Sequence, residues 1–235
     1  MADLSHLAHF SPVDLVAVMV LVICWAGSTL IIENPPARRP SVSRLMANYR
    51  RIWMHQFVTR EPRIFDSQIV GSLRQSTAFF ASASMIAIGG IFALLGNPDR
   101  LRGVADDLAV GNDPEVVWEV KLILTLLFAA NAFLKFVWSN RLFGYCSVMM
   151  GAVPNDASET AYARAGKAAE INIFAAKSYN RGLRTVYFGI ASAAWLVGAA
   201  PLIGAALLAL IVILRREFVS RSREVLVAPD PETDR

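Results

Sequence analysis

Seven polar residues, five of them basic, lie at the edges of long apolar runs: Arg74, Gln75, Asn131, Lys135, Arg141, Arg181 and Arg184. Charged side chains within a bilayer are rare and normally face the interior of a helix bundle. Guanidinium and ammonium groups gathered at one depth would attract a small anion or the phosphate of an anionic lipid. The sequence therefore predicts a basic vestibule for a ligand, an ion or a lipid.

The spacing within this group leaves a second interpretation open. Asn131 and Lys135 are four residues apart and therefore share one face of a helix. Trp138 follows within a turn, and tryptophan is typical of the membrane–water interface. Lys135 then either lines the vestibule or extends its long side chain to the membrane surface.

A second basic group lies in a segment with helical periodicity, residues 42–57. Its apolar residues recur at three- and four-residue spacing and are Val42, Leu45, Met46, Tyr49, Ile52, Trp53 and Phe57. This pattern predicts an amphipathic helix in the headgroup plane, with Arg44, Arg50, Arg51 and Trp53 at the membrane interface. The apolar stripe packing on the protein's own helices is the alternative, and both arrangements are compatible.

The elements that would position these residues are membrane-spanning helices. Of the 235 residues, 55% are hydrophobic and 18% are charged, whereas soluble domains carry about 25% charged residues. Three uncharged runs, residues 15–32, 75–96 and 185–214, match the roughly 20 residues that cross a hydrocarbon core.

We therefore expect an all-α fold, a polytopic transmembrane helical bundle with an amphipathic interfacial helix and a cytoplasmic Ala-rich helix. A single transmembrane domain is predicted over residues 1–227 and a disordered acidic tail over 228–235. The five expected spans cover about 12–32, 73–95, 118–138, 182–199 and 201–218.

Local signals mark where the helices begin and end. Residues 11–14, 113–115 and 156–159 combine a capping side chain with an acid in the first turn, and the last of these opens the Ala-rich helix. Residues 198–201 (Gly-Ala-Ala-Pro) interrupt the final apolar run. They predict a tight turn between the fourth and fifth spans.

The distribution of Lys and Arg supports an odd number of spans. Residues 33–74, 135–184 and 215–235 contain eight, seven and five of them, and only three lie elsewhere. Because positive residues concentrate on the cytoplasmic side, five spans with the N-terminus outside and the C-terminus in the cytoplasm fit this distribution. Four spans would leave the last five on the wrong side.

Several classes of function are excluded on sequence grounds. The net charge of +4 comes from residues that flank the apolar runs, and no nucleic-acid-binding motif accompanies them. No P-loop, dinucleotide, zinc-protease or serine-hydrolase motif occurs. We expect a non-enzymatic protein without a cofactor, a metal site or catalytic residues.

Three stretches, residues 66–77, 131–141 and 178–188, resemble the membrane-protein family catalogued as domain of unknown function 599. The resemblance extends over about residues 52–217. It implies a polytopic helical protein, mainly of bacteria and hence of the cytoplasmic (inner) membrane. It carries no established activity, ligand or catalytic residue.

Three functions remain in competition. The first is a homo-oligomeric channel or transporter-like protein that conducts a small anion past Arg74, Lys135 and Arg184. The second is an accessory or scaffold subunit of a larger membrane complex, with the amphipathic and Ala-rich helices as docking surfaces. The third is a protein that binds anionic lipid through the same basic face. The lipid bilayer is an expected partner in each case.

Overall fold

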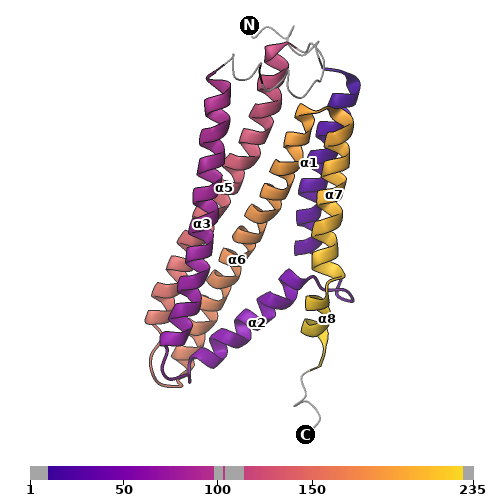
Figure 1. Cartoon of the computed structure of the whole chain (residues 1–235). Helices are drawn as coiled ribbons and strands as arrows, with labels where there is room; N and C mark the ends of the chain where they lie inside the picture. The colour runs from indigo at the N-terminus through magenta and orange to yellow at the C-terminus, as the bar shows by residue number, and fades with distance from the viewer. Residues whose placement is uncertain (1–9, 98–102, 104–113, 230–235) are drawn as a thin grey trace. The chain divides into compact units, whose positions relative to one another are not determined.

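The computed structural model describes residues 10–97, 103 and 114–229 (Figure 1), and no β-strand occurs in these ranges. Its elements in chain order are α1 (Pro12–Glu33), α2 (Val42–Phe57), α3 (Ile64–Leu95), α5 (Glu115–Gly151), α6 (Glu159–Ala193), the short 3-10 helix η2 (Ala194–Leu196), α7 (Ala199–Phe218) and α8 (Arg221–Val227). The predicted all-α class is confirmed.

Three of these helices, α1, α3 and α5, are long and apolar enough to cross a membrane. In the most apolar window of α3 only 6% of the residues are buried within the chain. A long helix that is apolar on its exposed surface is typical of contact with lipid. These three helices are those expected of a membrane protein. The predicted spans in α6 and α7 are not among these three, so the number five stays a prediction.

The first helix begins with the predicted capping box. The Ser11 backbone N–H and hydroxyl both donate to Asp14 Oδ2, at 3.0 and 2.7 Å, and the Asp14 N–H donates to Ser11 Oγ at 3.2 Å. Because these bonds satisfy polar groups that a helix leaves free in its first turn, they fix where α1 starts. The bounds of α1 agree with the prediction to within one or two residues.

The start of α6 differs from the prediction by the identity of its cap. Ser158, and not Asp156, precedes the first helical residue, and its Oγ accepts a hydrogen bond from the Ala161 N–H at 3.3 Å. Asp156 instead accepts from the Ser158 hydroxyl at 3.1 Å. The carboxylate therefore supports the cap from outside the helix. Asp113, the third predicted cap, lies outside the described residues.

The predicted interruption between α6 and α7 is confirmed. The helix α6 ends at Ala193, η2 follows, and Gly198 has a φ of +145° directly before α7 begins. Only glycine adopts such a backbone conformation without strain. The Ala-rich helix and the predicted fourth span form the single helix α6.

The chain forms two compact units. Unit 1 comprises residues 1–27, 80–134 and 181–211, and unit 2 comprises residues 28–79, 135–180 and 212–235. Each unit takes segments of α1, α3, α5, α6 and α7, while α2 and α8 lie entirely in unit 2.

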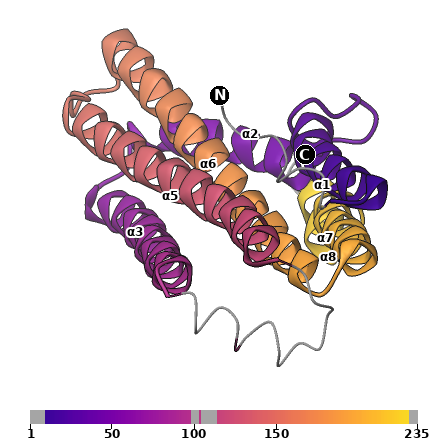
Figure 2. The same cartoon turned by 90° about the horizontal axis from the view of Figure 1, so that it is seen from above.

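In unit 1, α5 and α6 approach each other closely, as they run side by side in Figures 1 and 2. A Cβ added to Gly189 would lie 3.2 Å from Cβ of Phe128, so glycine permits this approach. Ser192 Oγ is 3.0 Å from Thr125 Oγ1. Trp25 of α1 meets the Phe128 ring edge-on at 5.4 Å between centroids. Small residues and paired hydroxyls are typical of helix contacts within membranes.

In unit 2, one apolar core joins α2, α3, α5 and α6. Its buried members are Met54, Phe57, Val58, Val70, Leu142, Phe143, Cys146, Met150, Val153, Ala161, Ala165, Ala168, Ala169 and Ala175. The alanines of α6 keep this contact narrow, and the hydroxyls of Ser139 and Ser178 donate to the carbonyls of Ala175 and Lys135 at 2.7 and 2.8 Å. Helix α2 also contacts α8, as Figure 1 shows.

Candidate functional site

The seven residues of the predicted vestibule are divided between the two units. Unit 1 contains Asn131, Arg181 and Arg184, and unit 2 contains Arg74, Gln75, Lys135 and Arg141. A single vestibule formed by all seven therefore stays a prediction.

Within unit 1, the three residues differ in exposure. Arg184 is 5% exposed, whereas Arg181, one turn earlier on α6, is exposed. Asn131 of α5 has a buried Oδ1 that accepts no hydrogen bond from the described part of the chain. An unsatisfied buried polar atom costs about 1–3 kcal/mol. The Oδ1 of Asn131 is therefore the atom of this group that would be stabilised most by a hydrogen bond from a ligand or a water molecule.

Within unit 2, Arg74 and Gln75 belong to α3, and Lys135 and Arg141 belong to α5. Arg74 and Gln75 are exposed, and the Asn140 amide donates to the Arg74 carbonyl at 2.9 Å. Arg141 Nε donates to the Tyr145 hydroxyl at 2.5 Å on the exposed side of α5. The backbone of Arg74 thus helps hold the helices together, while its side chain remains accessible.

The basic helix α2 begins at a well-defined cap. Ser41 Oγ accepts the Arg44 N–H at 3.2 Å and donates to the Ile32 carbonyl at 2.8 Å. One serine therefore caps α2 and ties it to the last turn of α1. Downstream, α2 buries Ala47, Met54 and Phe57, so this face packs on the protein.

The predicted interface residues of α2 differ in their exposure and in their contacts. Arg44 is exposed, and Arg51 forms an ion pair with Glu170 of α6 at 2.7 Å. Arg50 donates to the side-chain oxygen of Asn172, a buried residue of α6. Their placement toward lipid stays a prediction for Arg44 and Arg51, whereas Arg50 is directed at α6.

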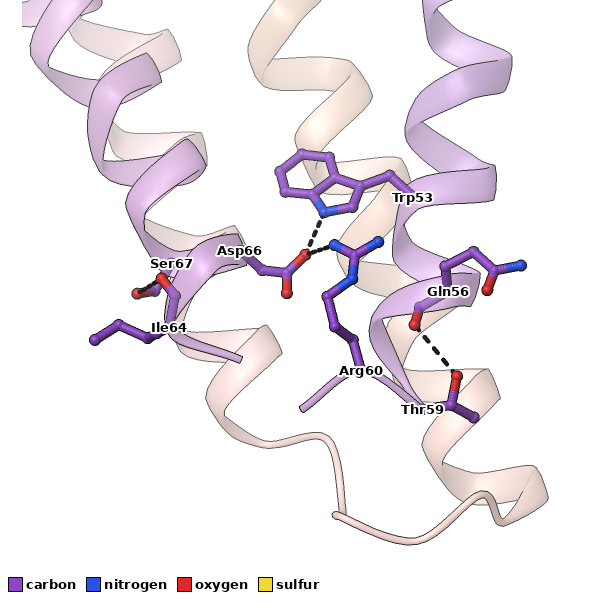
Figure 3. A network of polar contacts seen from close by, with 7 residues as sticks. All are labelled: Trp53, Gln56, Thr59, Arg60, Ile64, Asp66 and Ser67. Atoms are coloured by element: carbon purple, nitrogen blue, oxygen red, sulfur yellow. Dashed lines mark hydrogen bonds and ion pairs between the residues drawn. The ribbon is translucent and has the colours of Figure 1, made fainter. Parts of the chain in front are cut away.

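Trp53, the fourth predicted interface residue, belongs to a polar network in unit 2 (Figure 3). Its Nε1 donates to Asp66 Oδ1 at 2.6 Å, and Arg60 Nη1 donates to the same oxygen at 2.5 Å. The Asp66 side chain is 0% exposed, and its Oδ2 lacks a hydrogen-bond partner in the described residues. A single carboxylate thus holds the end of α2 and the following turn against the start of α3.

Unit 2 contains a pocket of about 280 Å³ that we call the basic pocket. It is lined by Ile32, Glu33, Val42, Ser43, Arg44, Met46, Ala47, Arg50, Arg51, Ile173, Ala176, Lys177, Asn180, Arg216 and Glu217. These residues come from the end of α1, the first half of α2, the middle of α6 and the end of α7.

Positive charge predominates in this pocket, with five basic and two acidic side chains in the lining. Glu217 is engaged at one side, since it accepts both the N–H and the hydroxyl of Ser43 at 2.9 Å. Burial lowers the pKa of the Arg50 guanidinium from its ordinary value, because desolvation disfavours the charged form. Arginine nevertheless stays protonated at neutral pH.

The pocket residues of α6 and α7 are not among the site residues predicted from the sequence. Ile173, Ala176, Lys177 and Asn180 follow at three- and four-residue spacing, which places them on one face of α6. That spacing could have predicted from the sequence that these four residues share one face of a helix. The contribution of Arg216 carried no comparable signal, because it depends on the tertiary contact of α7 with α2.

Comparisons with other proteins agree with the resemblance in the sequence. No curated protein and no solved structure matches the chain. The family described as protein of unknown function, DUF599, matches residues 16–222. The match covers most of the chain, which therefore belongs to the DUF599 family.

Proposed function

We propose that this chain is a non-enzymatic, multi-pass protein of the bacterial cytoplasmic membrane that binds an anion in the basic pocket of unit 2. One observation carries the proposal. Arg50 is partly buried in a pocket with excess positive charge, and its hydrogen-bond partner, Asn172, is a neutral amide.

The physical reason is the cost of desolvating a guanidinium without a countercharge. Removing an ion from water costs several kcal/mol, and a well-placed opposite charge recovers much of it. The Glu217 carboxylate of the lining is already bonded to Ser43. A bound anion would supply the missing charge and would accept the strong, charge-assisted hydrogen bonds that arginine forms.

The proposal is tested by the effect of inorganic phosphate on thermal unfolding of the full-length protein in a non-ionic detergent at low ionic strength. Phosphate at ten times its Kd should stabilise the protein by roughly 1.4 kcal/mol. This increase should disappear in Arg50→Gln and persist in Arg164→Gln, which alters an exposed arginine outside the pocket. An equal response of both variants, or none in the unchanged protein, would refute anion binding here.

The same proposal includes five spans, with the N-terminus outside and the C-terminus in the cytoplasm. The break at Gly198 supports a turn between two spans. The 20 Lys and Arg residues in the three predicted cytoplasmic zones, against three elsewhere, support the orientation.

A second candidate is the homo-oligomeric anion pathway through the predicted vestibule. It is favoured by the buried Arg184 and the unsatisfied Oδ1 of Asn131 in unit 1, since buried polar groups at membrane depth mark ion pathways. Anion flux into proteoliposomes that is unchanged after neutral replacement of Arg74, Lys135 and Arg184 would exclude it.

A further inference from the structure

The lining of the basic pocket contains apolar side chains as well as basic ones. Its apolar side chains are Ile32, Val42, Met46, Ala47, Ile173 and Ala176. Contact with these apolar side chains does not stabilise a free inorganic anion, because dehydrating its charge against hydrocarbon is unfavourable. A ligand that combines an anionic group with a hydrocarbon portion would interact favourably with both the basic and the apolar side chains.

The pocket also lies at the end of a helix that can cross the membrane. Ile32 and Glu33 belong to the last turn of α1, and both line the pocket. The polar end of a membrane-spanning helix lies at the depth of the lipid headgroups. The pocket is therefore at the level where phosphate groups of the bilayer are found.

Exposed apolar side chains continue from the pocket along the same two helices of unit 2. Leu30 and Ile31 precede the pocket on α1 and are 65% and 49% exposed. Met46 lines the pocket and is itself 39% exposed, and Tyr49 follows it on the outer side of α2. These residues form an exposed apolar surface beside the basic pocket, and hydrocarbon chains of lipid can contact it.

We infer that the basic pocket binds the phosphate of an anionic phospholipid, with the lipid's hydrocarbon portion against Val42 and Met46, which line the pocket and keep accessible surface. The inference rests on the proposed binding of an anion and adds the class of ligand. Arg50 and Lys177, on α2 and α6, are the basic residues assigned to the phosphate. The outward apolar side chains of α2 then contact the surrounding lipid.

The test is native mass spectrometry of the delipidated full-length protein in a mild non-ionic detergent, titrated with dioleoyl phosphatidylglycerol or dioleoyl phosphatidylcholine. We expect one phosphatidylglycerol to bind at least about tenfold more tightly than phosphatidylcholine, because both lipids carry the phosphate but the choline cation is repelled by the basic side chains of the pocket. Arg50→Gln and, separately, Lys177→Gln should remove this preference. Arg164→Gln, which alters an exposed arginine outside the pocket, is the matched control and should retain it.

Two further measurements separate a lipid from a free phosphate. Val42→Ser and Met46→Ser should weaken phosphatidylglycerol binding and leave the thermal response to inorganic phosphate unchanged. If glycerol phosphate binds as tightly as phosphatidylglycerol and the serine variants have no effect, the lipid inference fails while anion binding stands. If neither phosphate nor phosphatidylglycerol binds, both proposals fail.

Discussion

At the scale of single residues, Asp66 joins more of unit 2 than any sequence signal indicates. It is the third residue of α3, where an acid suits the helix N-terminus. Its Oδ1 also accepts hydrogen bonds from Trp53 and Arg60, as Figure 3 shows. The carboxylate therefore serves as a helix-end charge and as the acceptor that orients the end of α2.

Replacement of Asp66 by alanine should destabilise the protein by about 1–3 kcal/mol, because the Trp53 indole N–H and the Arg60 guanidinium lose their acceptor. Thermal unfolding in detergent, followed by circular dichroism at 222 nm (a helix band), measures the loss. The control is Ser67→Ala, because the Ser67 hydroxyl donates only to the Ile64 carbonyl of its own helix. Equal stability of the two variants would show that the network contributes little.

The hydrogen-bond partners of single side chains were the features least predictable from the sequence. Periodicity correctly predicted the helix that contains Arg50 and Trp53, since spacing groups residues by helix face. It did not indicate that Trp53 reaches Asp66 or that Arg50 reaches Asn172. Those partners lie on other helices, and the length and rotamer of a side chain decide which of them it meets.

At the scale of elements, the junction between α6 and α7 depends on one backbone conformation. Gly198 has a φ of +145°, and its carbonyl accepts the Leu202 N–H at 3.2 Å in the first turn of α7. Its N–H donates to the Trp195 carbonyl at 3.0 Å. This residue therefore ends one helical segment and starts the next.

Gly198→Ala should be destabilising by about 1–3 kcal/mol, because an L-residue is strained at this φ. Crowding is not the cause, since the nearest neighbour of an added Cβ, Pro201 Cδ, is 3.7 Å away. Gly204→Ala is the matched control within α7, where an added Cβ meets nothing within 4 Å. The midpoint of thermal unfolding should fall for Gly198→Ala alone, and a similar fall in both variants would contradict the backbone argument.

Elements were largely predictable because their signals are local. The Ser11–Asp14 capping box and the glycine–proline interruption at 198–201 each act within a few residues, and both are confirmed. At the start of α6, Asp156 and Ser158 both suit a cap, and the sequence alone does not rank them. The serine takes the position because it directly precedes the first helical residue.

At the scale of the whole molecule, the number of spans depends on how α6 is divided. The charged first part of α6 and its apolar last part form one continuous helix, Glu159–Ala193. Composition over this helix does not qualify it as a span, whereas α1, α3 and α5 qualify. Both three spans and five spans place the two ends of the chain on opposite sides. Reporters at the termini therefore cannot distinguish these arrangements.

Val197 distinguishes them, because it is 46% exposed at the junction of α6 and α7. With five spans and the N-terminus outside, Val197→Cys should react with a membrane-impermeant maleimide in intact cells. Ser222→Cys in α8 should react only after permeabilisation, and the unchanged chain, whose Cys24 and Cys146 are buried, gives the background. Labelling of Val197→Cys only after permeabilisation would place the junction in the cytoplasm. The chain would then cross the membrane three times, since α6 and α7 would both remain on the cytoplasmic side.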